Sequence, residues 1–186
     1  MPEQRTSILR DLLEWVVVLA VALICALLIQ RFIASPYTVP TGSMEDTIQI
    51  GDNIFAQKVT IGLGQGVSAG DIVVFNNPNA ASDHDILVKR VIAVGGQTVD
   101  LRDGAVYVDG ERLQEDYALG GSYPLDTQAP GVDVSYPYTV PAGSVWMMGD
   151  NRENSADSRY FGAVPDSDLI GVAFLRYWPL DRIGVL

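Results

Sequence analysis

The chain has 186 residues, enough for one domain of ordinary size plus an anchor, and its formal net charge is −11. Binding to nucleic acid needs a basic face for the phosphates, so this charge argues against nucleic acid as a partner. It also disfavours electrostatic attraction to anionic lipid, so we expect any contact with a membrane to be hydrophobic. A single cysteine, Cys25, excludes an intrachain disulfide.

The run 15–33 is almost wholly apolar until Gln30 and Arg31 near its end. As a helix these residues would rise roughly 28 Å, which is close to the hydrocarbon thickness of a bilayer. The sequence therefore predicts a transmembrane anchor helix over residues 12–33, preceded by a short cytoplasmic tail over residues 1–11.

A cleaved signal peptide is the alternative interpretation of this run. Cutting after Ala34 would place the bulky Phe32 three positions before the cut, where signal peptides carry a small residue. An uncleaved anchor is therefore favoured. Arg5 and Arg10 precede the helix and Arg31 follows it, a weak bias that favours a cytoplasmic tail with the bulk of the chain outside.

Beyond the anchor, short apolar runs are separated by Gly, Pro and Asp. This pattern predicts a mainly β domain over residues 35–186, with antiparallel sheets or a partly open barrel. Residues 44–50 add at most a helical turn. The runs 62–70 and 118–131 have the composition of loops, and a small appended subdomain is expected around residues 102–143. The expected strands are 53–59, 71–75, 86–94, 105–108, 134–140, 144–148 and 169–177.

Ser43 lies within Pro-Thr-Gly-Ser-Met, residues 40–44, a combination typical of a tight and exposed turn. Ten residues separate Ser43 from Ile33, and ten residues reach at most about 36 Å. If the serine reacts, it does so at or close to the membrane surface, which points to a substrate presented there. Taken alone, the motif favours an ordinary turn over a reactive serine.

A reactive serine needs a base to accept its proton, and two side chains of this chain are candidates. His84 is the only histidine, and the two aspartates that flank it favour its charged form, so a solvated loop histidine is predicted. Lys89 lies in the apolar run 86–92, where burial would lower a pKa that is about 10.4 in water. A neutral lysine amine can activate a serine hydroxyl. Strand alternation places one of Lys89 and Arg90 inside without deciding which.

Residues 149–162 read Gly-Asp-Asn-Arg-Glu-Asn-Ser-Ala-Asp-Ser-Arg-Tyr-Phe-Gly, which is unusually rich in polar groups. They predict a hydrogen-bonded loop beside the reacting groups, with a hydroxyl that orients the lysine amine and an Asp157–Arg159 ion pair that keeps the loop rigid. A surface loop with local turns is the alternative. A calcium loop is disfavoured because Arg152 stands at a ligand position and Ser155 at the turn glycine, and we expect no metal or cofactor.

These motifs, in this order, resemble those of the bacterial type I signal peptidases (leader peptidases). These are membrane-anchored serine endopeptidases that remove signal peptides from exported proteins. The resemblance is collinear over nearly the whole chain, and Ser-Met, Lys-Arg and the block 149–162 are its most specific parts. It departs at Asp46, where a proline is usual, and in the loop 93–97 after the lysine strand.

The resemblance implies a role for each matching residue. Ser43 would be the nucleophile and Lys89 the general base. Thr41 and the backbone N–H of Ser43 would form the oxyanion hole. Ser155 would hydrogen-bond the lysine amine, with Asp157 and Arg159 as a supporting ion pair. Shallow apolar pockets for small P1 and P3 side chains would be lined by Tyr37, Val39, Met44, Leu87 and Val88.

The expected partners are the signal peptides of exported preproteins, bound as an extended strand, together with the lipid bilayer and a nearby secretion translocon. The expected location is the bacterial cell membrane, with a single pass and the peptidase domain on the extracytoplasmic side. Two other functions remain open. A self-cleaving Ser-Lys peptidase shares the dyad but acts in the cytosol, and a catalytically silent, membrane-anchored β module would bind exported proteins without cutting them.

Overall fold

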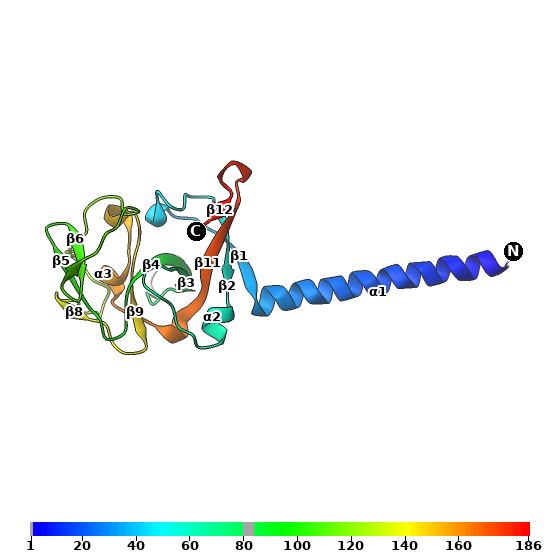
Figure 1. Ribbon diagram of the computed structural model, residues 1–186, viewed down its shortest axis with the longest axis horizontal. Helices are drawn as coiled ribbons and strands as arrows, with labels where there is room; N and C mark the ends of the chain where they lie inside the picture. The colour runs from blue at the N-terminus through cyan, green and yellow to red at the C-terminus, as the bar shows by residue number, and fades with distance from the viewer. Residues whose placement is uncertain (1, 80–83) are drawn as a thin grey trace.

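The computed structural model describes residues 2–79 and 84–186. Helix α1 (Pro2–Phe32) projects away from the β domain, as Figure 1 shows. Its segment Arg10–Phe32 is long and apolar enough to cross a membrane. The large apolar side chains along this segment are exposed, so the helix is not a core element of the β domain. Its apolar surface is left available for lipid.

The larger sheet is antiparallel throughout. Register shifts interrupt its two longest strands, and such irregularities bend a strand and increase its twist, so the sheet curls as seen in Figure 1. Its strand order is β1 (Ala34–Thr38), β2 (Asn53–Gln57), β11 (Leu169–Trp178), β3 (Ile72–Asn76), β4 (Ile86–Val94), β9 (Ser144–Met148) and β10 (Val164–Pro165), with β12 (Gly184–Val185) also paired to β11.

A smaller sheet lies at the end of the domain farthest from α1 (Figure 1). Its order is β7 (Glu111–Arg112), β6 (Ala105–Val108), β5 (Thr98–Arg102) and β8 (Tyr138–Thr139). Asp109 and Gly110 both have positive φ between β6 and β7, as a two-residue hairpin turn requires. The short helices are α2 (Val59–Gly62), α3 (Ser158–Phe161), η1 (Gly42–Met44), η2 (Arg152–Asn154), η3 (Asp166–Asp168) and η4 (Leu180–Arg182).

Three clusters of buried side chains hold these layers together. The first packs α3 onto the sheet, with Phe161 against Phe75 at a ring separation of 6.1 Å. The second joins the turn after β1 to strands β2 and β3 through Met44. The third places Trp146 of β9 against the smaller sheet, which is thereby fixed to the larger one. The second cluster is the one that positions the site, because Met44 directly follows Ser43.

The expected mainly β fold, with a partly open antiparallel sheet and one N-terminal apolar helix, is confirmed. Some expected elements differ. Of the expected strand 134–140, only Tyr138–Thr139 forms a regular strand, and Pro137 just before it lacks the N–H that a ladder needs. Strand β5 was not expected, since Thr98–Arg102 alternates polar and apolar residues only briefly. The helical turn begins at Gly42, two residues before the expected run 44–50.

Candidate active site

The turn η1 carries Ser43 directly after the edge strand β1. Thr41 is still extended, and the chain then tightens at Gly42. Met44 is fully buried in the core beneath the turn and anchors it, whereas Ser43 remains 7% exposed. The buried Met44 side chain thus anchors the turn in the core, while the neighbouring Ser43 stays partly exposed at the surface.

Lys89 extends from β4 into the interior, and its exposure is only 2%. Its Nζ lies 2.6 Å from the Oγ of Ser43 and 3.1 Å from the carbonyl oxygen of Val88. Arg90 extends to the opposite face, where it binds Asp150 at 2.6 and 2.8 Å. The structure therefore decides what strand alternation left open, since the lysine is the inner residue of the pair.

Burial lowers the pKa of the Lys89 amine to about 8, against the opposing effect of the carboxylates of Asp157 and Asp150; the Arg159 guanidinium also lowers this pKa, to a smaller extent. An amine with that pKa is neutral in about one molecule in ten at pH 7, whereas an unperturbed lysine is neutral in only about one in 2500. The site thus holds an amine that is able to accept a proton near neutral pH.

Two hydroxyl groups lie around this pair. The Oγ1 of Thr41 is 3.5 Å from the Oγ of Ser43. The Oγ of Ser155 is buried and has no hydrogen-bond partner within residues 2–79 and 84–186, so its expected hydrogen bond to Lys89 is not formed in this structure. The Ser155 hydroxyl is instead packed against the Cα of Gly149, while the Lys89 amine is directed to Ser43 and Val88.

The turn after β9 supports the serine from the other side. The backbone N–H of Asn151 donates to the carbonyl oxygen of Ser43 at 3.0 Å, and its side-chain amide donates to the carbonyl oxygen of Gly42 at 3.1 Å. Gly149 has no room for a side chain, because a Cβ there would overlap the Ser43 carbonyl oxygen and the Ser155 hydroxyl. Sequence reasoning gave Asn151 no role, although its place in the block 149–162 was the available signal.

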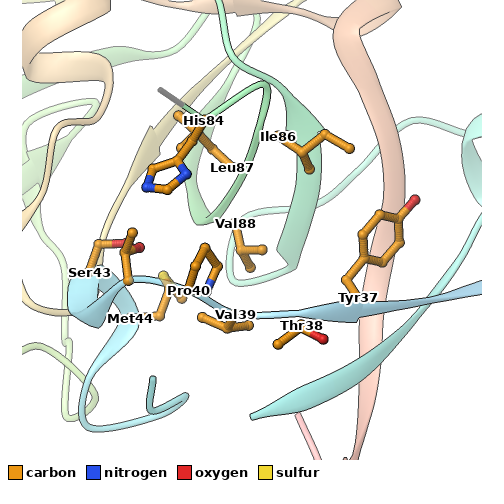
Figure 2. Close-up of a pocket in the computed structure, with 11 residues that line it drawn as sticks. Tyr37, Thr38, Val39, Pro40, Ser43, Met44, His84, Ile86, Leu87 and Val88 are labelled. Atoms are coloured by element: carbon orange, nitrogen blue, oxygen red, sulfur yellow. The ribbon is translucent and has the colours of Figure 1, made fainter. Parts of the chain in front are cut away.

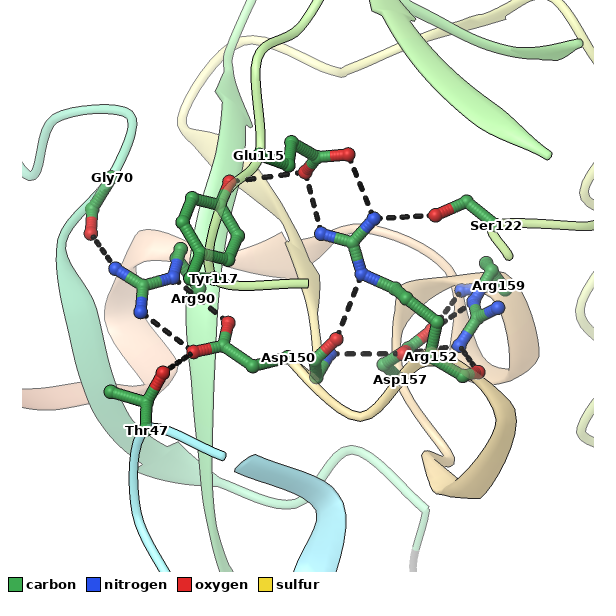
Figure 3. Close-up of polar contacts among 11 residues, drawn as sticks. Thr47, Gly70, Arg90, Glu115, Tyr117, Ser122, Asp150, Arg152, Asp157 and Arg159 are labelled. Carbon is green, nitrogen blue, oxygen red and sulfur yellow. Dashed lines mark hydrogen bonds and ion pairs between the residues drawn. The ribbon is translucent and has the colours of Figure 1, made fainter. Parts of the chain in front are cut away.

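Two buried ion pairs frame this turn, as Figure 3 shows. Asp157 and Arg159 pair through two contacts of 2.9 Å, and Asp157 also accepts from the N–H of Gly149 at 3.1 Å. On the other side, Asp150 accepts from Arg90 and from the hydroxyl of Thr47 at 2.6 Å. Buried charges are tolerated when they are paired and hydrogen-bonded, as these are. The Arg90–Asp150 pair was missed from the sequence.

A cavity of about 210 Å³ opens beside Ser43 between β1 and β4 (Figure 2). Its walls are mainly apolar, and it is smaller than most ligand pockets, so it suits small side chains. His84 lies outside any strand and is exposed, as expected of a solvated loop residue, and it also lines this cavity. All five expected pocket residues line the cavity: Tyr37, Val39, Met44, Leu87 and Val88.

A second cavity of about 220 Å³ also reaches Ser43 and His84, and it is lined in addition by Lys89, Asn154 and Tyr160. The serine and lysine thus stand where two hollows meet, an arrangement that lets an extended chain pass across them. Within the part of the chain that the structure describes, no group of three or more His, Cys, Asp or Glu side chains is arranged to hold a metal ion.

Comparison with known proteins assigns this chain to a family. The family model described as signal peptidase, peptidase S26, matches residues 12–178. A probable signal peptidase I-1 of Synechocystis sp. is 40% identical over 178 residues, covering 93% of this chain and 86% of that protein. Signal peptidase IB of Staphylococcus aureus is 33% identical over 182 residues, covering 93% of each.

A solved structure of a signal peptidase I from Enterococcus faecalis V583 is 34% identical and covers 57% of this chain and 96% of that one, with a TM-score of 0.46. The family match and the identities to the two relatives are sufficient by themselves to assign the family. The chain belongs to the signal peptidase (peptidase S26) family, and it is therefore a hydrolase of this serine peptidase class.

We expect Gly149→Ala to displace the turn that carries Ser43, because the overlapping Ser43 carbonyl belongs to the backbone and cannot turn aside. Overpacking of this kind costs about 1–3 kcal/mol, which lowers the Tm by about 2–10 °C. We also expect a slower reaction of Ser43 with a fluorophosphonate probe. The control is Gly62→Ala, where the new Cβ meets nothing within 4 Å. A Gly149→Ala protein that matched wild type in both measurements would contradict the assigned contact.

Proposed function

We propose that this protein is a membrane-bound serine endopeptidase that cleaves N-terminal signal peptides from exported preproteins after small residues at P1 and P3. One observation carries the proposal: the hydroxyl of Ser43 and the buried amine of Lys89 are 2.6 Å apart at the end of a small apolar cavity. Membership of the signal peptidase family supports the same conclusion.

In the proposed mechanism the neutral amine of Lys89 accepts the proton of the Ser43 hydroxyl as its Oγ attacks the scissile carbonyl carbon. The oxyanion that forms accepts hydrogen bonds from the backbone N–H of Ser43 and the hydroxyl of Thr41. Lys89 then gives the proton to the leaving amine, and an acyl-enzyme remains on Ser43. Water hydrolyses this ester with Lys89 again as the base.

Ser155, Asp157 and Arg159 are proposed to support the dyad. The Ser155 hydroxyl is buried and has no hydrogen-bond partner among the described residues, so a rotation about its Cα–Cβ bond can offer it to the lysine amine during turnover. The Asp157–Arg159 pair fixes the N–H of Gly149 and the carbonyl of Arg152, so the turn beside Ser43 stays in place.

The strand edges beside the cavity suit an extended peptide. β1 is the terminal strand of its sheet, and β9 pairs with β4 only from Arg90 onward, which leaves Ile86–Val88 with an open edge among the described strands. A signal peptide lying between these edges would pair through its backbone and place alternate side chains in the cavity. Because alternate side chains of an extended peptide point to the same side, P1 and P3 would both face the cavity. The small volume of the cavity would then limit both positions to small residues.

We also propose a single-pass topology with the tail in the cytoplasm and the peptidase domain outside. The apolar segment Arg10–Phe32 leads into β1 through one residue, so Ser43 stays close to the bilayer and to a nearby secretion translocon. Exposed Trp178, Leu180 and Ile183 offer the domain a further apolar contact with lipid. Protease added to intact spheroplasts should digest the domain and spare an N-terminal tag; a protected domain would reverse the orientation.

Cleavage of a preprotein with an Ala-x-Ala site, assayed in lipid, tests the function directly. Wild type should cut at the expected bond, and Ser43→Ala and Lys89→Ala should each lose at least about 100-fold in kcat, the usual contribution of a nucleophile or base. His84→Ala tests the histidine as the alternative base and should keep nearly the full kcat, whatever change in KM follows from its place in the cavity wall. A large loss of kcat in that variant would make histidine the base, whereas no cutting by wild type would favour the silent binding module.

The pH dependence tests Lys89 as the base. Its amine must be neutral to act, so kcat/KM should rise with pH and level off above the pKa of about 8. Well below that pH, where the ammonium predominates, the rate should fall about tenfold per pH unit. Initial rates between pH 5 and 9.5, with a control for unfolding at each pH, give the profile. A rate that stayed flat into acid would rule out the lysine.

A further inference from the structure

Residues 115–122, here called the clasp segment, lie along the turn that supports Ser43. The segment precedes the block 149–162 and belongs to none of the motifs that carry the family resemblance. Its Leu119 N–H donates to the carbonyl of Asp150 at 2.7 Å, and the N–H of Arg152 donates to the carbonyl of Leu119 at 2.8 Å. The clasp segment and the turn thus form a short parallel bridge centred on Leu119 and Asn151.

Glu115 begins the clasp segment and neutralises a deeply buried arginine. The Arg152 side chain is 1% exposed, and its guanidinium binds the two Glu115 carboxylate oxygens at 2.9 and 2.5 Å (Figure 3). The same guanidinium donates through Nε to the carbonyl of Gly149 at 2.9 Å and also contacts the hydroxyl of Ser122. A guanidinium this deep requires its counterion, because an unpaired buried charge is very costly.

Tyr117 connects the clasp segment to the second ion pair. Its hydroxyl donates to Glu115 at 3.0 Å, and its ring lies over the guanidinium of Arg90 at 4.0 Å. Arg90 in turn pairs with Asp150, the residue after Gly149. The ring shields this pair from water, and a cation over an aromatic face adds attraction of its own. The clasp segment therefore reaches both ends of the Gly149–Arg152 turn.

From these contacts we propose that Glu115 is a positioning residue for the Ser43–Lys89 pair, and that it acts through Arg152 on the turn 149–152. This proposal rests on the function proposed above. Glu115 holds the guanidinium that holds the Gly149 carbonyl. Two residues on, Asn151 holds the carbonyl of Ser43. Gly149 packs so closely against the same Ser43 carbonyl that even a Cβ would not fit between them, so a shift of the turn 149–152 moves the serine.

Removing the charge of Glu115 should therefore affect turnover more than binding. Without its counterion, the Arg152 guanidinium turns toward water and releases the Gly149 carbonyl. The serine then moves relative to the amine, and a misplacement of about 1 Å can cost about 100-fold in rate. The apolar cavity beside Ser43 is lined from β1, the turn after it and the His84–Val88 segment at the start of β4, none of which contacts Glu115, so substrate affinity should change little.

The experiment compares Glu115→Gln with wild type in lipid, using an Ala-x-Ala preprotein peptide and a fluorophosphonate that phosphonylates Ser43 with loss of fluoride. Labelling Ser43 to completion with the fluorophosphonate gives the number of correctly folded sites. Dividing the cleavage rate by this number gives kcat per active site. We expect kcat and the rate of Ser43 phosphonylation to fall about 10–100-fold while KM stays within about threefold. Glu111→Gln, an exposed glutamate on the neighbouring β7, is the matched control and should behave as wild type.

A Glu115→Gln protein with an unchanged kcat per labelled site would overturn the proposal, even if fewer sites were folded, because Glu115 would then serve stability alone. If this variant does not fold, Tyr117→Phe decides: it removes only the hydroxyl that orients Glu115, and it should lower kcat about 2–5-fold with KM unchanged. Wild type that is phosphonylated but does not cut the peptide would refute the proposed function, while the phosphonylation rates would still test Glu115.

Discussion

A lysine amine buried to 2% exposure beside a serine hydroxyl is the constraint on which the rest of this structure depends. Burial makes the amine a base near neutral pH, but it is stable only where the surrounding strands exclude water and carboxylates stand at a suitable distance. Asp157 and Asp150 provide that opposing charge without pairing directly with Lys89, since each is bound to its own arginine. Full pairing with a carboxylate would return the pKa toward that of an ordinary lysine.

The need to keep water away from Lys89 and to hold Ser43 beside it accounts for the strands and turns packed around the site. Lys89 lies on a strand between β3 and β9, and the turn that carries Ser43 is set by Met44 below and by Asn151 beside it. Backbone contacts and ion pairs hold this turn and deform little, so the distance between the Ser43 hydroxyl and the Lys89 amine is well defined. The smaller sheet carries neither of these two residues, but it is packed onto β9, and the loop after its strand β7 carries Glu115, which pairs with Arg152.

The short connection between the apolar helix and β1 links the site to the proposed membrane anchor. The helix ends at Phe32 and β1 begins at Ala34, so the edge strand that borders the cavity starts at the end of the domain nearest to the helix. With the proposed anchor in a bilayer, a peptide that leaves the bilayer in extended form would meet this edge without a long excursion. On the proposed function, this geometry suits substrates that are themselves anchored in the membrane.

By itself the sequence determined the apolar helix, the mainly β class and the residue types of the site, because these depend on local periodicity, turn chemistry and motif order. Only the tertiary structure decided that Lys89 rather than Arg90 faces inward, that the Ser155 hydroxyl has no hydrogen-bond partner among the described residues, and that His84 borders the cavity. It alone showed that Asn151 holds the Ser43 carbonyl, that Asp150 pairs with Arg90 and that Glu115 pairs with Arg152, contacts between residues 108, 60 and 37 positions apart in the chain. Contacts across such separations are set by how sheets pack, and no local pattern encodes them.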